Sequence, residues 1–238
     1  MKGKKQILIT GGSGGIGSAI CNKLIEQDYT IFNLDKLSPK DSFNQKFIEI
    51  DLLDLSYLKT IMQEISRENN LVAFIHCAGY GGPYHLITEV SEQEWDSIFT
   101  INVKSAYIIL TYLLEKWKSK NFGRFIAIAS SLSVVGSKNS VAYSASKHAL
   151  VGFVKSIADE WGAFGITSNA ISPGYVKTAM GVQEDQVQGH LEQILQKTPS
   201  KKIATPKEIA RVVCFLLDEE STYINGANWM VDGGITAI

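Results

Sequence analysis

Tyr143 and Lys147 lie four positions apart in the segment AYSASKHAL, residues 142–150. On a helix, residues at this spacing share one face. A phenol has a pKa near 10, which is poorly matched to proton transfer at pH 7 to 8. An ammonium about 4.5 Å away, at an effective dielectric of 20, favours the phenolate by roughly 3 to 4 kcal/mol. The pair is therefore suited to make a tyrosine that acts as an acid or base, although the spacing alone is usual for a surface pair.

A glycine-rich segment, TGGSGGIG, occupies residues 10–17 and follows a short apolar run. Glycines there permit a tight turn and let backbone N–H groups approach a pyrophosphate at a helix N-terminus. The spacing differs from the common G-x-G-x-x-G pattern, but the mechanics are the same. The alternative is a glycine-rich turn that holds no ligand. We expect the segment to bind a dinucleotide through Gly11, Ser13, Gly14, Gly15, Ile16 and Gly17.

Asp35 ends the next apolar run, about twenty residues further on. A carboxylate at that place can accept hydrogen bonds from an adenosine ribose. It would also repel a 2′-phosphate, since one charge facing two at about 5 Å costs roughly 1.5 kcal/mol even in water. The sequence therefore favours NAD over NADP as the cofactor, with Lys36 able to soften the repulsion. The alternative is a solvated aspartate at a strand end.

Apolar runs alternate with helical patterns along the chain, which indicates parallel strands joined by crossover helices. The runs are near-continuous, as in a sheet that is buried on both faces. We expect one domain, residues 1–238, of the α/β class: a Rossmann-like, doubly wound, mainly seven-stranded parallel sheet with helices on both faces. The expected strands are Gln6–Thr10, Tyr29–Asp35, Lys46–Asp51, Leu71–Gly79, Arg124–Ser130, Ile166–Ser172 and Asn228–Gly234.

Three segments carry helix signals. Ala19–Gln27 has apolar residues at helical spacing, and both Ser91–Glu94 and Thr205–Glu208 match a capping box. We expect a long helix after Ser91 and another from Thr205 toward Leu217, with Pro206 at its first position. Ligands of a doubly wound sheet bind beyond the carboxyl ends of its strands, and the residues singled out above fall near such ends.

Composition narrows the class of protein. The net charge of −1 gives no electrostatic case for nucleic acid or an anionic membrane. No segment is expected to span a membrane, and the apolar run after the basic start is too short for a signal peptide. Three widely spaced cysteines indicate free thiols in a reducing compartment, hence a cytoplasmic protein. The scattered histidines His85, His148 and His190 indicate no metal site.

Six ordered motifs, together with the serines that precede Tyr143, resemble the short-chain dehydrogenase/reductase family across essentially the whole chain. They are TGGSGGIG, IHCAG, INVKS, AYSASK, NAISPGYVKT and WMVDGG. The resemblance implies that Tyr143 passes a proton to or from the substrate oxygen while hydride passes to or from nicotinamide C4. It further implies that Lys147 lowers the tyrosine pKa and binds the nicotinamide ribose, that Asn102 helps to hold a proton relay, and that Ser130, or failing that Ser131, orients the substrate oxygen.

The resemblance also assigns cofactor contacts, a lid and an assembly. The cofactor contacts are Asp51 and Leu52 at the adenine, Ala78 and Gly79 beside its ribose, and Val176 and Thr178, after Pro173 and Gly174, at the nicotinamide carboxamide. Residues 179–201 would form the substrate lid, and the chain would assemble as a homotetramer or homodimer. Two departures put fine cofactor contacts in doubt. His76 and Cys77 replace two asparagines of the usual motif, and Ala127 replaces a common asparagine. We expect His76 to be packed or bonded locally rather than catalytic.

The expected function is an NAD-dependent alcohol dehydrogenase or ketone reductase that acts on a small to medium secondary alcohol or its ketone. One alternative is a 3-oxoacyl-[acyl-carrier-protein] reductase, which usually prefers NADPH and needs a basic surface for its acidic carrier. Asp35 and the near-neutral charge count against it, whereas a local patch near Lys201 and Lys202 would favour it. A second alternative is a non-catalytic dinucleotide sensor or scaffold.

Overall fold

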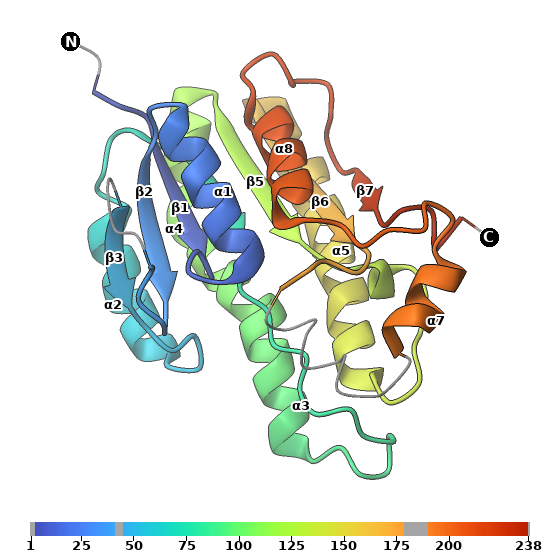
Figure 1. The fold of residues 1–238 in the computed structure, drawn as a ribbon. Coiled ribbons are helices and arrows are strands. Elements are labelled where there is room, and N and C mark those ends of the chain that lie inside the picture. The colour runs from blue at the N-terminus through green and yellow to red at the C-terminus, as the bar shows by residue number, and fades with distance from the viewer. Residues whose placement is uncertain (1–2, 41–44, 179–189, 238) are drawn as a thin grey trace.

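Seven parallel strands form one sheet in the computed structural model, which describes residues 3–40, 45–178 and 190–237. The strand order is β3-β2-β1-β4-β5-β6-β7, so the chain winds outward in both directions from its first strand (Figure 1). The strands are β1 (Gln6–Thr10), β2 (Thr30–Asp35), β3 (Gln45–Glu49), β4 (Leu71–His76), β5 (Gly123–Ile128), β6 (Ile166–Pro173) and β7 (Asn228–Val231). The expected doubly wound parallel sheet is confirmed.

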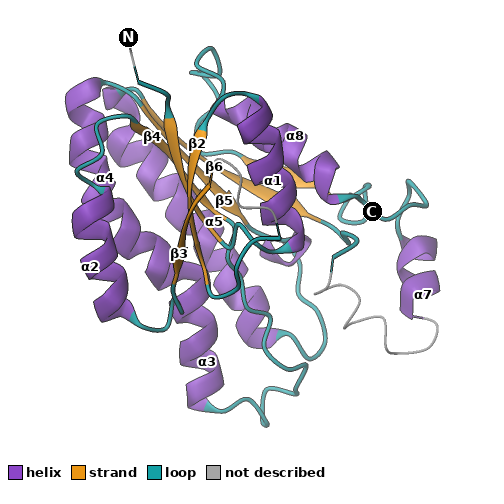
Figure 2. Cartoon of the chain, turned by 60° about the vertical axis from the view of Figure 1, so that its left-hand side comes forward, coloured by secondary structure: helices purple, strands orange, loops and turns teal. Residues whose placement is uncertain are grey.

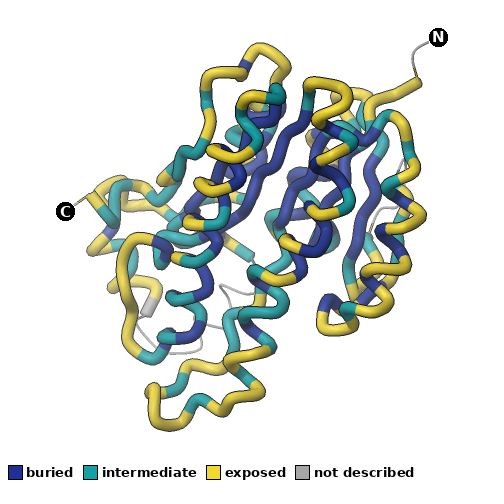
Figure 3. The backbone as a smooth tube through the Cα atoms, turned by 180° about the vertical axis from the view of Figure 1, so that it is seen from behind, coloured by how far each residue is buried: buried dark blue, intermediate teal, exposed yellow. Residues whose placement is uncertain are grey.

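Helices cover both faces of the sheet (Figure 2). On one face, α1 (Gly15–Glu26) and α8 (Pro206–Leu217) enclose a core that includes Ile7, Ile20 and Val213. On the other face, α2 (Leu55–Ile65), α4 (Ser105–Lys120) and α5 (Val141–Trp161) enclose a second core. Two shorter helices are α3 (Glu92–Phe99) and α7 (His190–Lys197). The strands form the buried centre in Figure 3 because both of their faces are covered.

Most strand ends are set by the neighbouring strand. β3 ends at Glu49, opposite Asp35, and β7 ends at Val231, opposite Pro173. The expected strands ran several residues further, to Asp51 and Gly234. Those extensions are wrong because the neighbouring strand ends: Ile50 still donates to the Asp35 carbonyl at 3.0 Å, but beyond it β2 offers no further residue with which to continue the ladder. The residues that leave the sheet in this way form the turns at its carboxyl edge.

The helix signals are confirmed, and α1 begins earlier than expected, at Gly15 rather than Ala19. Ser91 caps α3 with both halves of a capping box, and Glu208 accepts a hydrogen bond from the Thr205 N–H at 2.8 Å. The long helix expected after Ser91 exists as α3, a π-helical turn η1 (Thr100–Lys104) and α4 in succession. Two 3₁₀ turns, η2 (Ser131–Ser133) and η3 (Gly162–Phe164), flank α5.

The continuous helix Glu92–Lys120 is 29 residues long and apolar enough to cross a membrane by length and composition alone. This criterion is a mean over a window and not a continuous run of about 18 apolar residues, which the helix does not contain, so the expectation that no segment spans a membrane stays a prediction. Half of its most apolar window is buried inside the protein. Ile109, Leu113 and Trp117 belong to the core against the sheet, which explains why this helix is so apolar.

Candidate active site

The glycine loop between β1 and α1 is built for close backbone approach. Gly11 has a φ of +71°, and a Cβ on Gly17 would lie 2.0 Å from the Gly11 carbonyl oxygen. A Cβ on Gly15 would lie 2.7 Å from Thr178 Cγ2, so residues far apart in the chain meet at this loop. The N-cap residue Gly14 makes no side-chain capping bond to the first turn of α1. Free N–H groups and the helix dipole suit this end of α1 to a pyrophosphate.

Asp35 lies beside the glycine loop, at the end of β2. Its Oδ2 accepts a hydrogen bond from the Ser13 N–H at 2.9 Å, and its Oδ1 accepts one from Leu37 at 3.1 Å. Asn33 donates to the Ser13 hydroxyl at 3.1 Å. These bonds fix the carboxylate against the loop that would hold the phosphates. The residues therefore fit an adenine dinucleotide at this edge of the sheet.

The other expected cofactor residues all lie in segments just beyond strand ends, or at the last residue of a strand. Asp51 accepts a hydrogen bond from Leu53 at 2.9 Å, which orders the turn that buries Leu52. Gly174 donates to the Val231 carbonyl at 3.1 Å, and Val176 forms a bridge with Ala204. The turns that collect at this edge contain Asp51, Leu52, Ala78, Gly79, Pro173, Gly174, Val176 and Thr178. Of the expected lid, residues 179–189 lie outside the described residues.

Tyr143 and Lys147 lie one turn apart on α5, as expected. Lys147 is buried, and its Nζ donates to the Ile128 carbonyl at 2.9 Å, at the end of β5. Its Nζ lies 5.5 Å from the centre of the Tyr143 ring. Ser130 makes a side-chain hydrogen bond with Tyr143, whereas Ser131 belongs to the 3₁₀ turn that follows. Of the two candidate serines, Ser130 is thus the one whose side chain bonds to Tyr143.

The electrostatics of Tyr143 differ from the simple expectation. Burial raises the pKa of the phenol, and the hydrogen bond with Ser130 acts in the opposite direction. Burial lowers the pKa of the Lys147 ammonium to about 8, opposed by the nearby Cys77. The net pKa of Tyr143 is therefore raised in the protein alone, and the prediction that Lys147 lowers it, which concerns one contribution to that value, stays a prediction. The Coulomb argument omitted desolvation, which here is the larger effect.

Asn102 lies at the centre of the π-helical turn and is completely buried. Its Oδ1 accepts from the Tyr80 N–H at 2.8 Å, and its Nδ2 donates to the Tyr80 carbonyl at 3.1 Å and to Ser146 Oγ at 2.9 Å. Ser146 donates in turn to the Tyr143 carbonyl at 2.7 Å. Isolated π turns are frequent at functional sites. The periodicity of the sequence does not predict this π-helical turn.

His76 and the three cysteines are the remaining titratable residues of interest near the site and in the core. The imidazole is bonded locally, to Thr10 and to the backbone of Asn102, as expected. Cys21, Cys77 and Cys214 are free thiols, and burial raises the pKa of Cys21 and Cys77 to about 12. Within residues 3–40, 45–178 and 190–237, no three ligating side chains gather in a way that could hold a metal ion.

A cavity opens beside Tyr143 between the loop after β4, helix α3 and the start of α5. Gly81, Pro83, Glu94, Ile98 and Ser140 are among the residues that line it. The two loops that border it carry exposed apolar side chains: Tyr80, Tyr84, Leu86, Ile87, Val134 and Val135. The cavity itself has a mixed lining, with Pro83 and Ile98 as apolar residues and Glu94 and Ser140 as polar ones.

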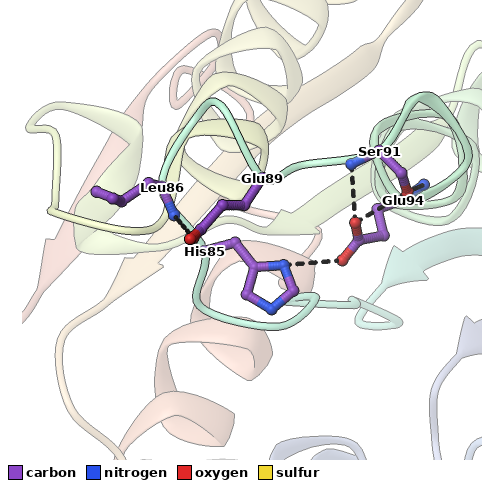
Figure 4. Close-up of polar contacts among 5 residues, drawn as sticks. All are labelled: His85, Leu86, Glu89, Ser91 and Glu94. Atoms are coloured by element: carbon purple, nitrogen blue, oxygen red, sulfur yellow. Dashed lines mark hydrogen bonds and ion pairs between the residues drawn. The ribbon is translucent and has the colours of Figure 1, made fainter.

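The loop after β4 is tied to the start of α3 by polar contacts (Figure 4). His85 Nδ1 lies 3.4 Å from Glu94 Oε1, and Leu86 donates to Glu89 at 3.0 Å. Glu94 also accepts from the Ser91 N–H at 2.9 Å, while the Ser91 hydroxyl accepts from the Glu94 N–H at 3.2 Å. One glutamate thus completes the helix cap and lies beside His85 of the loop that borders the cavity.

Replacing Ser91 with alanine is expected to lower the free energy of unfolding by about 1 kcal/mol, because the helix loses its N-cap acceptor. For a domain of this size the melting temperature falls by about 2 to 4 °C. Thermal unfolding followed by circular dichroism measures the change. Ser156→Ala, which alters an exposed serine inside α5, is the matched control and should not destabilise. Equal melting temperatures for Ser91→Ala and the original protein would show that the cap is dispensable.

The fold and the site define a class: a dinucleotide-binding α/β protein with a tyrosine, lysine and serine at the carboxyl edge of its sheet. Comparisons with known proteins agree. A family model described as enoyl-(acyl carrier protein) reductase matches residues 11–236. The 3-oxoacyl-[acyl-carrier-protein] reductase FabG of Buchnera aphidicola is 32% identical over 243 residues, covering 98% of this chain and 97% of that protein.

Two solved structures extend the comparison. ElxO with NADP bound is 26% identical with a TM-score of 0.91, covering 99% of this chain and 100% of that one. A 4-hydroxyisoleucine dehydrogenase complexed with NADH is 25% identical with a TM-score of 0.93, covering 99% and 100%. The chain belongs to the short-chain dehydrogenase/reductase family. It is an NAD(P)-dependent oxidoreductase that acts on CH–OH groups or the corresponding ketones.

Proposed function

We propose that this protein interconverts a small to medium secondary alcohol and its ketone with NAD(H), and that Tyr143 is the acid or base. The observation that carries the proposal is the convergence of Ser130, Tyr143 and Lys147 at the end of β5, with Tyr143 in the lining of the cavity. The nicotinamide cofactor supplies or accepts the hydride when it is bound.

Each polar group in this arrangement has a task. Tyr143 gives its hydroxyl proton to the substrate oxygen in reduction and takes it back in oxidation. Ser130, which hydrogen-bonds with Tyr143, orients the substrate oxygen. Lys147, held by the Ile128 carbonyl, supplies positive charge that favours the phenolate and binds the cofactor ribose. Asn102 holds the loop and helix on either side of this group and supports the proton relay.

The cofactor itself would be held by groups from the same edge of the sheet. The glycine loop, Gly11 to Gly17, would bind the pyrophosphate, and Asp35 would bind the adenosine ribose. Asp51 and Leu52 would contact the adenine, with Ala78 and Gly79 beside its ribose. Residues from Pro173 to Thr178 would hold the carboxamide, with Gly174 and Val176 fixed in place by the C-terminal segments.

The test is to follow NADH absorbance in two assays. In one, the protein is mixed with NAD and a panel of secondary alcohols, sugars and hydroxyacids; in the other, it is mixed with NADH and the corresponding ketones. Turnover with at least one pair supports the proposal and begins to define the substrate. Tight NADH binding without turnover on the whole panel would favour the alternative of a non-catalytic dinucleotide sensor. The same assays with NADP and NADPH measure cofactor preference.

Asp35 is the residue proposed to select NAD. Replacing it with asparagine is expected to raise the ratio of kcat/KM for NADP to that for NAD by about tenfold or more, because the charge that repels a 2′-phosphate is removed. Asparagine keeps an acceptor for the Ser13 N–H, so the loop keeps its shape. Asp28→Asn makes the same charge change at an exposed turn and should leave the ratio unchanged. An unaltered ratio in Asp35→Asn would remove this residue from cofactor selection.

A second candidate, 3-oxoacyl-[acyl-carrier-protein] reductase, is favoured by the similarity to FabG of Buchnera aphidicola. Exposed apolar side chains at the cavity suit an acyl chain, and Lys201 and Lys202 are exposed. Asp35 counts against the NADPH that such enzymes usually prefer. Acetoacetyl groups carried on an acyl carrier protein and on coenzyme A separate the candidates. Faster NADPH than NADH oxidation with either would favour the second candidate, and no oxidation with the carrier-bound substrate would exclude it.

We further propose that residues 1–238 form one domain, with residues 179–201 as its substrate lid, and that the protein is cytoplasmic. Three free cysteines support a reducing compartment. A homotetramer or homodimer is the proposed assembly. It is supported by the exposed apolar side chains Tyr107, Phe215 and Met230 on outer helices and the last strand. Light scattering after size-exclusion chromatography measures the assembly directly.

A further inference from the structure

His76 is a completely buried imidazole at the end of β4. Its Nδ1 lies 2.9 Å from Thr10 Oγ1, and its Nε2 lies 3.1 Å from the backbone oxygen of Asn102. A carbonyl oxygen can only accept, so Nε2 must carry the proton. The Thr10 hydroxyl then donates to Nδ1. These bonds satisfy both nitrogens of a single neutral tautomer.

The imidazole remains neutral across the physiological range. Burial, followed by the positive charge of Lys147 on α5, lowers the pKa of His76 to about 3. The thiol of the adjacent Cys77 keeps its proton, because burial raises its pKa to about 12. A neutral imidazole therefore faces the Lys147 ammonium, and the tautomer described above persists at every pH at which the enzyme would work.

Through these bonds His76 joins three segments of the site. Thr10 is the last residue of β1 and the first of the glycine loop, and its hydroxyl also accepts from the Ala78 N–H at 3.4 Å. Asn102 belongs to the π-helical turn. The imidazole thus holds the start of the glycine loop, the turn after β4 and the π-helical turn at fixed separations.

The π-helical turn carries the side chain that supports the reacting group. With its backbone oxygen held by His76, Asn102 uses its amide on Tyr80 and on Ser146, which bonds to the Tyr143 carbonyl. A Cβ added to Gly79 would lie 3.3 Å from Lys147 Nζ and 3.7 Å from Asn102 Oδ1. Lys147 and Asn102 therefore both approach Gly79 from the side to which a Cβ would point.

We propose that His76 is a positioning residue for proton transfer: its Nε2–H holds the Asn102 carbonyl and so sets the Asn102 amide beside Lys147 and the helix turn of Tyr143. This inference rests on the proposed function, because it concerns the proton transfer assigned to Tyr143. His76 acts through Asn102 and touches neither substrate nor cofactor.

Two substitutions separate the bonds of the imidazole. Asparagine reaches only as far as Nδ1, so His76→Asn keeps a partner for Thr10 and loses the bond to Asn102. Glutamine reaches as far as Nε2, so His76→Gln keeps a donor for the Asn102 carbonyl. We expect His76→Asn to lower kcat by about tenfold or more with little change in KM, since a bond inside a buried network is lost. His76→Gln should recover most of that loss.

A purely structural role predicts a different pattern. Both variants would then lower the melting temperature without separating in kcat, and the pH profile of kcat would keep its shape. Thermal unfolding and NADH binding by fluorescence accompany the kinetics, and His148→Asn, at an exposed position of α5, is the control for histidine substitution. Equal kcat values for His76→Asn and His76→Gln would overturn the proposal.

The tautomer can be tested in the protein without cofactor or substrate. Nitrogen-15 NMR of the imidazoles, with the His76 signals assigned by their loss in His76→Gln, should show a neutral ring protonated at Nε2 and unchanged from pH 5 to pH 8. An ordinary titration in that range, or a proton on Nδ1, would overturn the proposal whatever the kinetics show. If Tyr143→Phe retained full turnover, the proposed function would fail instead, and the positioning role would fail with it even though the NMR tautomer was as expected.

Discussion

Replacing Tyr143 with phenylalanine is expected to lower kcat by about 10²- to 10⁴-fold, the range that one positioned general acid or base contributes. Phenylalanine keeps the ring that packs at the start of α5 and removes only the hydroxyl that hydrogen-bonds with Ser130. KM should change little, because the lost interaction is specific to the transition state. Initial rates in both directions, on whichever alcohol and ketone the panel identifies, measure the effect.

The control for Tyr143→Phe is Tyr107→Phe, which removes the hydroxyl of a tyrosine that is 53% exposed on α4. Its kinetics and melting temperature should match those of the original protein. NADH binding should survive in both variants, since the glycine loop and Asp35 are untouched. If Tyr143→Phe turned over at the original rate, another group would have to move the proton, and the assignment of Ser130, Tyr143 and Lys147 would be wrong.

The sheet could be predicted from the sequence because several strands contain a short apolar run, such as residues 7–9 in β1 and 72–75 in β4. Two helix starts could be predicted because their caps are local: Ser91 and Glu94 lie three residues apart and bond to each other. The ends of the strands could not be predicted in the same way. Glu49 ends β3 because Asp35 ends β2, and a pairing between distant segments leaves no mark in a local pattern.

The candidate site also contains some features that a local sequence pattern predicts and others that depend on contacts between distant segments. Tyr143 and Lys147 could be found because one helix turn holds both. The hydrogen bonds of His76 to Thr10 and Asn102 span 66 and 26 residues, so no spacing rule reveals them. The π-helical turn at Asn102 inserts one residue into a helix whose apolar pattern continues on both sides. Desolvation of Tyr143 also depends on which segments fold over it, so its pKa direction could not be judged from Lys147 alone.

Replacing Lys147 with methionine is expected to lower kcat by about 10²-fold or more, because the charge that favours the Tyr143 phenolate is lost. The same change should raise stability at pH 7. Methionine fills a similar volume, and it removes an ammonium that folding must take out of water. The substitution is thus expected to lower activity and to raise stability, as is usual where function requires a buried group that destabilises the fold.

The pH dependence of that stability gain follows from the pKa of Lys147. The folded value, about 8, lies below the ordinary 10.5, so between these values the unfolded chain binds more protons and the stability of the original protein rises with pH. A difference of about 2.5 pKa units corresponds to about 3 kcal/mol at low pH. About 1 kcal/mol of it should be recovered between pH 7 and pH 9.

Denaturant unfolding of Lys147→Met and of the original protein at pH 7, 8 and 9 measures this difference. The advantage of the variant should shrink as pH rises. The thiol of Cys21, whose raised pKa opposes the trend above pH 9, is present in both proteins. Cys77 interacts with Lys147, but burial raises its pKa to about 12, so the folded protein keeps this thiol protonated from pH 7 to pH 9. Lys155→Met, at an exposed position on the same helix, should alter neither activity nor the pH dependence. A variant whose stability difference stayed constant from pH 7 to pH 9 would show that the Lys147 ammonium is not desolvated, and the electrostatic basis of its role would have to be abandoned.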